Sequence, residues 1–152
     1  MATLDENLTI RPAGLQDAAV VLALYGDLAA AYGEQQADAG ILRQWDEVLA
    51  DHRQHILVAE QDGAVAGTLT LVVVPNLGHN GQPWAAIANV VVAAGHRGHG
   101  IGKALIAEAG QIARRHNCYK IVLSSNLIRK EAHEFYRRLG WKQTHIGFSL
   151  EL

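Results

Sequence analysis

The chain has 152 residues, of which 49% are hydrophobic, and its formal net charge is −2 at pH 7. This length suits one compact core, so we expect a single domain over residues 1–152. Intrinsic disorder requires low hydrophobicity with high net charge, and nucleic-acid binding usually requires a basic domain. The composition therefore argues against a disordered protein and against a nucleic-acid partner.

The sequence shows no targeting or membrane signal. Residues 1–7 are polar and acidic, unlike a signal peptide. No uncharged apolar run reaches the roughly 20 residues that a membrane-spanning helix needs. The single cysteine, Cys118, excludes an internal disulfide. We therefore expect a cytoplasmic protein that has no membrane partner.

The first half of the chain is predicted to form three strands and two helices. Segments 18–31 and 39–52 have the composition and apolar spacing of helices, and Asp17 stands where it can cap the first one. Asp62-Gly63 is a strong hairpin signal between two strand-like segments. The predicted strands are 8–13, 55–60 and 64–74.

The second half is predicted to alternate strands and helices. Segment 84–93 is typical of a central strand, because Asn89 is the only polar residue between positions 85 and 93. Asn117 and Gly140 are candidate left-handed helix caps. The predicted elements after a loop at 76–83 are the strand 84–93, helix 101–116, strand 119–124, helix 130–139 and a last strand or strand pair at 141–152. This order predicts an α/β fold, a mixed sheet with helices on both faces.

A glycine-rich turn joins the strand at 84–93 to the helix that follows. The N-terminus of a helix presents unpaired N–H groups and a partial positive charge, and glycines let a phosphate approach the backbone closely. Arg97 and Lys103 add positive charge at the two ends of the turn. A plain strand-to-helix connection explains one glycine, but not all four, which are Gly95, Gly98, Gly100 and Gly102.

Two other phosphate-binding motifs do not fit this turn. The dinucleotide motif G-x-G-x-x-G fails in both frames, since its last glycine would be Lys103 or Leu105. The Walker A motif fails because Ala104 replaces its hydroxyl residue and Arg97 replaces its first glycine.

The turn does match R-x-x-G-x-G, from Arg97 to Gly102, after an apolar strand. It resembles the acetyl-CoA motif of the GCN5-related N-acetyltransferase (GNAT) family. Residues 132–141 resemble the family's second motif, A-x-x-F-Y-x-x-x-G-F, with Trp141 at the last position. The resemblance covers nearly the whole chain. It implies an acetyl-CoA-dependent N-acetyltransferase with a mostly antiparallel mixed sheet that splays between its fourth and fifth strands.

The resemblance also implies which residues bind acetyl-CoA, the cosubstrate. The strand before the turn would pair its backbone with the pantetheine arm, and the Val90 N–H would stabilise the oxyanion at the acetyl carbonyl. Asn126 and Arg129 stand near the position of a family asparagine and are further candidate contacts. The complete set of expected cofactor contacts is Val90, Val91, Val92, Arg97, Gly98, His99, Gly100, Ile101, Gly102, Lys103, Asn126 and Arg129.

Tyr136 matches the family tyrosine that protonates the departing CoA thiolate. A phenol with a pKa near 10 is a plausible proton donor to a thiolate. The alternative is a structural role, in which Tyr136 is the i+4 core partner of Ala132.

The sequence has no acid at the usual position of the general base, the group that takes the amine proton. Related small-molecule enzymes often place an acid eight residues before the arginine, but this chain has Asn89 there, which cannot act as a base. Histidine is a common general base in enzymes, so His79 is the candidate base, with Glu34 and Asp38 as alternatives.

The acceptor is expected to be a small primary amine. Residues 117–123 are similar to glucosamine-phosphate N-acetyltransferases, and residues 131–136 and 141–146 resemble aminoalkylphosphonate N-acetyltransferases. Acetylation of a protein or peptide, and a non-catalytic acetyl-CoA-binding regulatory role, are the alternatives. The close histidine pairs lack acidic or cysteine partners at ligand spacing, so no metal is expected. The resemblance also suggests a homodimer.

Overall fold

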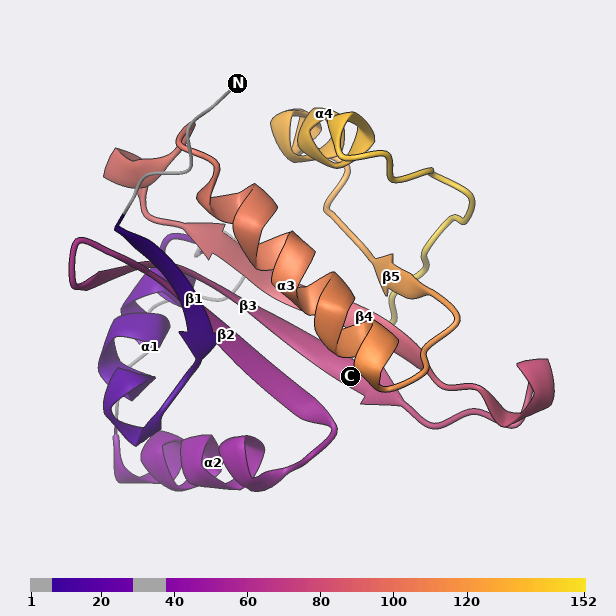
Figure 1. Cartoon of the computed structure of the whole chain (residues 1–152), viewed down its shortest axis with the longest axis horizontal. Coiled ribbons are helices and arrows are strands. Elements are labelled where there is room, and N and C mark those ends of the chain that lie inside the picture. Colours follow the sequence, from indigo (N-terminus) through magenta and orange to yellow (C-terminus); the bar gives the residue numbers. More distant parts are fainter. Residues whose placement is uncertain (1–6, 29–37) are drawn as a thin grey trace. The chain divides into compact units, whose positions relative to one another are not determined.

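The computed structural model describes residues 7–28 and 38–152 (Figure 1). The chain divides into two compact units, residues 1–122 and 123–152. Helix α4 (Lys130–Arg138) belongs to the second unit. The helices of the first unit are α1 (Ala18–Gly26), α2 (Ala39–Ala50) and α3 (Ile101–Arg115). Its strands are β1 (Leu8–Pro12), β2 (Gln54–Gln61), β3 (Ala64–Val74), β4 (Trp84–Val92) and the beginning of β5 (Ile121–Leu123).

The strands form one sheet in the order β1-β2-β3-β4-β5. The first four are antiparallel, and β5 joins β4 in parallel, so the predicted mixed and mostly antiparallel sheet is confirmed. The hairpin between β2 and β3 turns at Asp62 and Gly63, whose φ angles are 52° and 80°. A two-residue type I′ turn needs positive φ at both positions, which explains why Asp-Gly predicts this hairpin.

Helices cover both faces of the sheet, as predicted. Ile56 and Val58 on β2 pack with Trp45 of α2 and with α1 residues in one buried cluster. On the opposite face, Gly67 of β3 lies directly beneath Leu105 of α3. Successive strand residues point to opposite faces, so these contacts place α3 on one side and α1 with α2 on the other (Figure 1).

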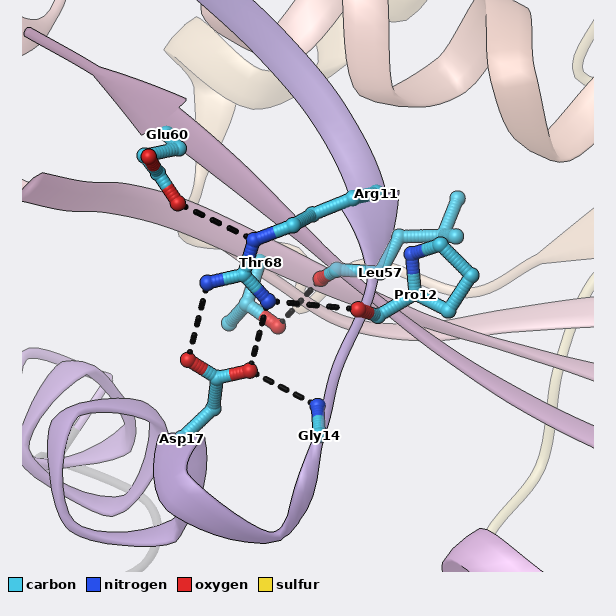
Figure 2. Close-up of polar contacts among 7 residues, drawn as sticks. All are labelled: Arg11, Pro12, Gly14, Asp17, Leu57, Glu60 and Thr68. Atoms are coloured by element: carbon cyan, nitrogen blue, oxygen red, sulfur yellow. Dashed lines mark hydrogen bonds and ion pairs between the residues drawn. The ribbon is translucent and has the colours of Figure 1, made fainter. Parts of the chain in front are cut away.

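The end of β1 is tied to the start of α1 by Arg11 (Figure 2). Its guanidinium donates to both carboxylate oxygens of Asp17, at 2.7 and 3.1 Å, and to Glu60 on β2 at 3.0 Å. The Asp17 carboxylate also accepts from the Gly14 N–H at 2.7 Å. Asp17 therefore stands at the predicted N-cap position of α1, but its side chain does not cap the helix: its backbone is already helical and its carboxylate points back to Arg11.

Three predicted elements differ from the structure. Helix α1 ends at Gly26, and residues 29–31 of the predicted helix lie outside the described residues. Strand β5 is half-buried and covers three residues of the expected six. Residues 141–152 form no strand, although apolar and polar residues alternate there. Alternation alone cannot hold a strand, because its backbone groups need hydrogen-bonding partners.

Both predicted left-handed caps are confirmed, with φ angles of 58° at Asn117 and 89° at Gly140. Asn117 donates its N–H to the Arg114 carbonyl, and the next residue donates to Ala113, which closes the end of α3. No helix among the described residues is both long and apolar enough to cross a bilayer. That the whole chain acts as one domain stays a prediction.

Candidate functional site in β4 and the glycine turn

Strand β4 contains a β-bulge at the position expected to face the acetyl group. The β3–β4 register shifts between Thr68 and Thr70, so that Asn89 and Val90 together stand opposite the single residue Leu69. Such a two-against-one arrangement kinks the strand and takes backbone groups out of the regular ladder. Val90, the predicted oxyanion donor, therefore lies at an irregular point of β4.

Asn89 is the residue that adopts the unusual backbone of this bulge. Its φ angle is 54°, in the left-handed region that most side chains avoid and that Asn tolerates well. The sequence analysis treated Asn89 only as the place of a missing acid. An asparagine tolerates this backbone, but the residue type alone does not specify a bulge.

The glycine turn after β4 leaves its backbone open to a ligand. Gly98 and Gly100 have φ angles of 81° and 84°, and a side chain at either position would meet no other atom within 4 Å. The first helical hydrogen bond of α3 runs from the Ala104 N–H to the Gly100 carbonyl, at 3.0 Å. The N–H groups of residues 101–103 therefore have no partner within the helix and form an anion-binding helix N-terminus.

Side chains of the turn brace it and carry charge. The Arg97 Nε donates to the Val92 carbonyl at 3.0 Å, which ties the turn to the end of β4. Lys103 is exposed on the first turn of α3. The Nδ1 of His99, also exposed, lies 3.4 Å from the His96 carbonyl. The structure thus brings the predicted residues of β4 and the turn together in the first unit.

Gly67 positions the start of α3, and the sequence analysis missed it. A Cβ on Gly67 would lie 3.0 Å from the Ile101 side chain and 3.2 Å from the Val91 carbonyl oxygen. Because Gly67 has no side chain, the first residue of α3 can pack close to the sheet at this point of β3. A glycine inside a strand often marks such a close approach.

Three other predicted residues lie in the second unit. Tyr136 is half-buried on α4, with its ring 5.2 Å from Phe135 and 5.9 Å from Trp141, centroid to centroid. Burial raises the pKa of Tyr136, while the charge of Arg129 acts in the opposite direction. A half-buried phenol with a raised pKa keeps its proton at neutral pH and is suited to donate it.

Asn126 organises the entry to α4. Its side-chain Oδ1 accepts from the Ile128 N–H at 3.1 Å, and its carbonyl accepts from the Arg129 N–H at 3.0 Å and from His133 Nε2 at 2.9 Å. These hydrogen bonds account for a polar residue at position 126 without any contact to a ligand. Contacts of Asn126 and Arg129 with the cofactor stay predictions.

The candidate bases are held in other interactions or lie outside the described residues. The ring of His79 stacks on Tyr119 with centroids 3.8 Å apart, beside the start of β4. From Trp84 to Val90 the strand rises about 20 Å, at roughly 3.3 Å per residue, so the start of β4 lies about that far from the predicted oxyanion donor. Asp38 caps α2 by accepting from the Ile41 N–H at 2.9 Å, and position 34 is not among the described residues. That His79 is the base stays a prediction.

Neither a thiol nucleophile nor a metal centre stands out in the part of the chain that the structure describes. Cys118 is half-buried, and burial raises the pKa of its thiol, which disfavours the reactive thiolate. Within residues 7–28 and 38–152, no three His, Cys, Asp or Glu side chains are grouped so that they could hold a metal ion.

The chain is similar to known acetyltransferases. Residues 21–141 match the model of the Acetyltransferase (GNAT) family. The chain is 33% identical over 90 residues to glucosamine 6-phosphate N-acetyltransferase of Trypanosoma brucei brucei, a match that covers 59% of each protein and so less than two thirds of that relative. It is 36% identical to aminoalkylphosphonate N-acetyltransferase of Salmonella typhimurium, over 68% of this chain and 67% of the relative.

A solved structure supports the same assignment. A putative acetyltransferase from Agrobacterium tumefaciens is 32% identical and superposes with a TM-score of 0.88, over 95% of this chain and 99% of that one. The family match covers most of the chain and includes β4, the glycine turn and α4. The chain therefore belongs to the GNAT family of acetyl-transferring enzymes.

Proposed function

We propose that this protein transfers the acetyl group of acetyl-CoA directly to the primary amine of a small molecule. The observation that carries the proposal is the glycine turn, which begins a 15-residue helix immediately after the bulged strand β4. The helix N-terminus at the glycine turn suits a pyrophosphate, and the bulge in β4 offers irregular backbone groups to an acyl group.

The turn would hold the pyrophosphate through backbone groups. The free N–H groups at the start of α3 point toward a ligand at the helix N-terminus, where the helix dipole favours negative charge. Gly98 and Gly100 leave the approach unobstructed. Arg97 and Lys103 add two positive charges, and beyond its bond to Val92 the Arg97 guanidinium has no hydrogen-bond partner among the described residues.

In the chemical step, the amine nitrogen bonds to the acetyl carbon and the carbon–sulfur bond breaks. The Val90 N–H would donate to the carbonyl oxygen as negative charge develops on it. Tyr136 would give its proton to the departing thiolate and recover one from solvent. The proton of the attacking amine passes to a base or to water. A low-pKa amine would make a dedicated base unnecessary.

Cys118 supports direct transfer over an acetyl-cysteine intermediate. Its pKa is raised by burial, so little thiolate is available to attack the thioester. Mass spectrometry after incubation with acetyl-CoA alone should find no acetyl group on the protein. An acetylated Cys118 would overturn this part of the proposal.

We further propose that the acceptor carries a phosphate or phosphonate group. Two of the relatives are named for glucosamine 6-phosphate and for aminoalkylphosphonates, which share a primary amine and an anionic group. Acetylation removes the positive charge of such an amine and leaves the anionic group unchanged.

The test is thiol release from acetyl-CoA over a panel of amines, with acetyl-CoA binding measured separately by calorimetry. The panel contains aminoalkylphosphonates, glucosamine 6-phosphate, the corresponding amines without the anionic group, and peptides. We expect turnover with an amine that bears the anion and much less with its neutral counterpart. Binding of acetyl-CoA without turnover of any amine would instead indicate a regulatory domain, and turnover of peptides alone would indicate a protein acetyltransferase.

A further inference from the structure

A hollow lies at the start of β4, away from the glycine turn. It has a volume of about 310 Å³, which is within the range of small-molecule pockets. Val73, Pro75 and Pro83 supply apolar walls, and His52, Arg53 and His116 supply polar ones. These residues come from the α2–β2 connection, the end of β3, the β3–β4 loop and the end of α3, which are all in the first unit.

Arg53, which lines the hollow, and Arg115, the neighbour of the lining residue His116, are each paired with an acid. Arg53 donates from Nε and Nη2 to Asp51, at 3.1 and 3.2 Å. Those hydrogen bonds hold the pKa of Asp51 at about 2, so this carboxylate stays charged. Arg115 is paired with Glu108 at 3.2 Å. Among the described residues, Nη1 of Arg53 has no protein partner and remains available as a donor.

Histidines supply further polar groups at the hollow. His55, on β2, is next to the lining residue His116, with ring centroids 5.0 Å apart and the rings edge to face. Its Nε2 is buried and has no hydrogen-bond partner among the described residues. Burial lowers the pKa of His55, and the nearby His116, Arg115 and His52 lower it further, so its ring favours the neutral form. Basic side chains from the α2–β2 connection and the end of α3 therefore gather here, with Asp51 and Glu108 as the acids paired with the two arginines.

We propose that this hollow binds a small organic anion, with a phosphate-type head beside His52, Arg53 and His116 and an apolar body against Val73, Pro75 and Pro83. An anion there would accept hydrogen bonds from the imidazole N–H groups and from the charged guanidinium of Arg53. A phosphate head can accept from several donors at once, and the neighbouring apolar walls favour a carbon-containing ligand over the free ion.

The site is separate from the proposed reaction centre. Val73 is paired with Ala85, and Val90 lies five positions further along β4. At roughly 3.3 Å per residue this distance is about 17 Å. A small acceptor that reacts near Val90 would not extend to the hollow, so the anion is a second ligand. The inference does not depend on the proposed transfer reaction.

The experiment is a titration of the whole protein with phenyl phosphate, followed by calorimetry and by the imidazole NMR signals. Saturating CoA is present so that the probe cannot occupy the glycine turn. We expect saturable binding that shifts signals of His52, His55 and His116 and is weaker for inorganic phosphate.

The variants His116→Gln and Arg53→Gln should each weaken binding of phenyl phosphate by about tenfold, the effect of removing one favourable charge contact. Both positions are exposed, so the fold should be retained, and circular dichroism checks this. Arg43→Gln on the exposed surface of α2 is the matched control and should bind normally. Absence of saturable binding, or equal weakening in Arg43→Gln, would overturn the proposal.

Discussion

Arg11 and Asp17 form a two-pronged ion pair, with Nη1 2.7 Å from Oδ2 and Nη2 3.1 Å from Oδ1. The Asp17 side chain is almost fully buried, and the Arg11 side chain is 29% exposed. Because Arg11 also contacts Glu60, this one side chain joins β1, β2 and the beginning of α1. The pair therefore fixes the edge of the sheet to the helix that covers it.

The first prediction concerns the variant Asp17→Asn. It removes the charge but retains one oxygen for the Gly14 N–H, and should lower the free energy of unfolding by about 2 kcal/mol at pH 7, as for other hydrogen bonds to charged groups. Urea denaturation measures the effect. The exposed variant Asp27→Asn is the control and should change the unfolding free energy by less than about 0.5 kcal/mol.

The effect of Asp17→Asn should depend on pH. Hydrogen bonds from Arg11, and from the Gly14 N–H, lower the pKa of Asp17 in the folded protein, although burial partly opposes this. A depressed pKa means that the stabilisation is present above the unfolded value of about 3.9 and is lost as pH falls through the folded pKa. The difference between wild type and Asp17→Asn should therefore shrink below about pH 4. A difference that stays constant to pH 2 would show that the charge is not its cause.

The second prediction concerns Gly67. In Gly67→Ala the new methyl group would lie 3.0 Å from the Ile101 side chain and 3.2 Å from a backbone oxygen that cannot easily move. Overpacking of this kind costs about 1–3 kcal/mol, and here it should also displace the first turn of α3. We expect a lower melting temperature together with weaker acetyl-CoA binding in calorimetry.

Gly26→Ala is a matched control for Gly67→Ala. Gly26 ends α1 with a negative φ angle, and a Cβ there would meet nothing within 4 Å. This variant should keep or slightly raise stability, since alanine favours the helix by up to about 1 kcal/mol. Normal acetyl-CoA affinity in Gly67→Ala would show that α3 does not depend on this close approach.

Local sequence signals were sufficient where neighbouring residues determine the backbone. Asp62-Gly63 and the two helix caps, Asn117 and Gly140, adopt the positive φ angles that their residue types favour. The glycine turn belongs to the same class, because its function depends on backbone freedom within a few positions. These features could be predicted because no distant part of the chain is needed to specify them.

Tertiary contacts decided the features that the sequence analysis missed or misread. Aspartate is a residue type that often caps helices, but the carboxylate of Asp17 is held by Arg11 from another element. The bulge at Asn89 appears only in the register between β3 and β4. The alternation in residues 141–152 predicts a strand, yet a strand also needs a partner, which a single-sequence pattern cannot supply.

The third prediction compares three residues at the bulge of β4. Asn89→Gly should retain activity, because glycine adopts positive φ without strain. Asn89→Val should lose stability by about 1–2 kcal/mol, the cost of a left-handed backbone for an ordinary residue, and should lower kcat with little change in KM for acetyl-CoA. Steady-state kinetics and thermal unfolding measure the two effects.

The kinetic pattern separates a positioning role of Asn89 from a purely structural one. If the bulge serves only folding, then Asn89→Val will lose stability while the folded fraction keeps its kcat. If Asn89→Gly loses activity as much as Asn89→Val, then the amide side chain matters and the backbone argument fails.

The last prediction concerns Tyr136→Phe, which removes the phenolic proton and retains the ring contacts with Phe135 and Trp141. Loss of a general acid should lower kcat by about 100-fold with little change in acetyl-CoA affinity. Because burial raises the pKa of Tyr136, the wild-type kcat should stay high up to about pH 10 and fall only above that value, where the phenol ionises. In Tyr136→Phe this alkaline decline should disappear. A variant with wild-type kcat, or with an unchanged alkaline decline, would assign Tyr136 to the packing of α4 alone.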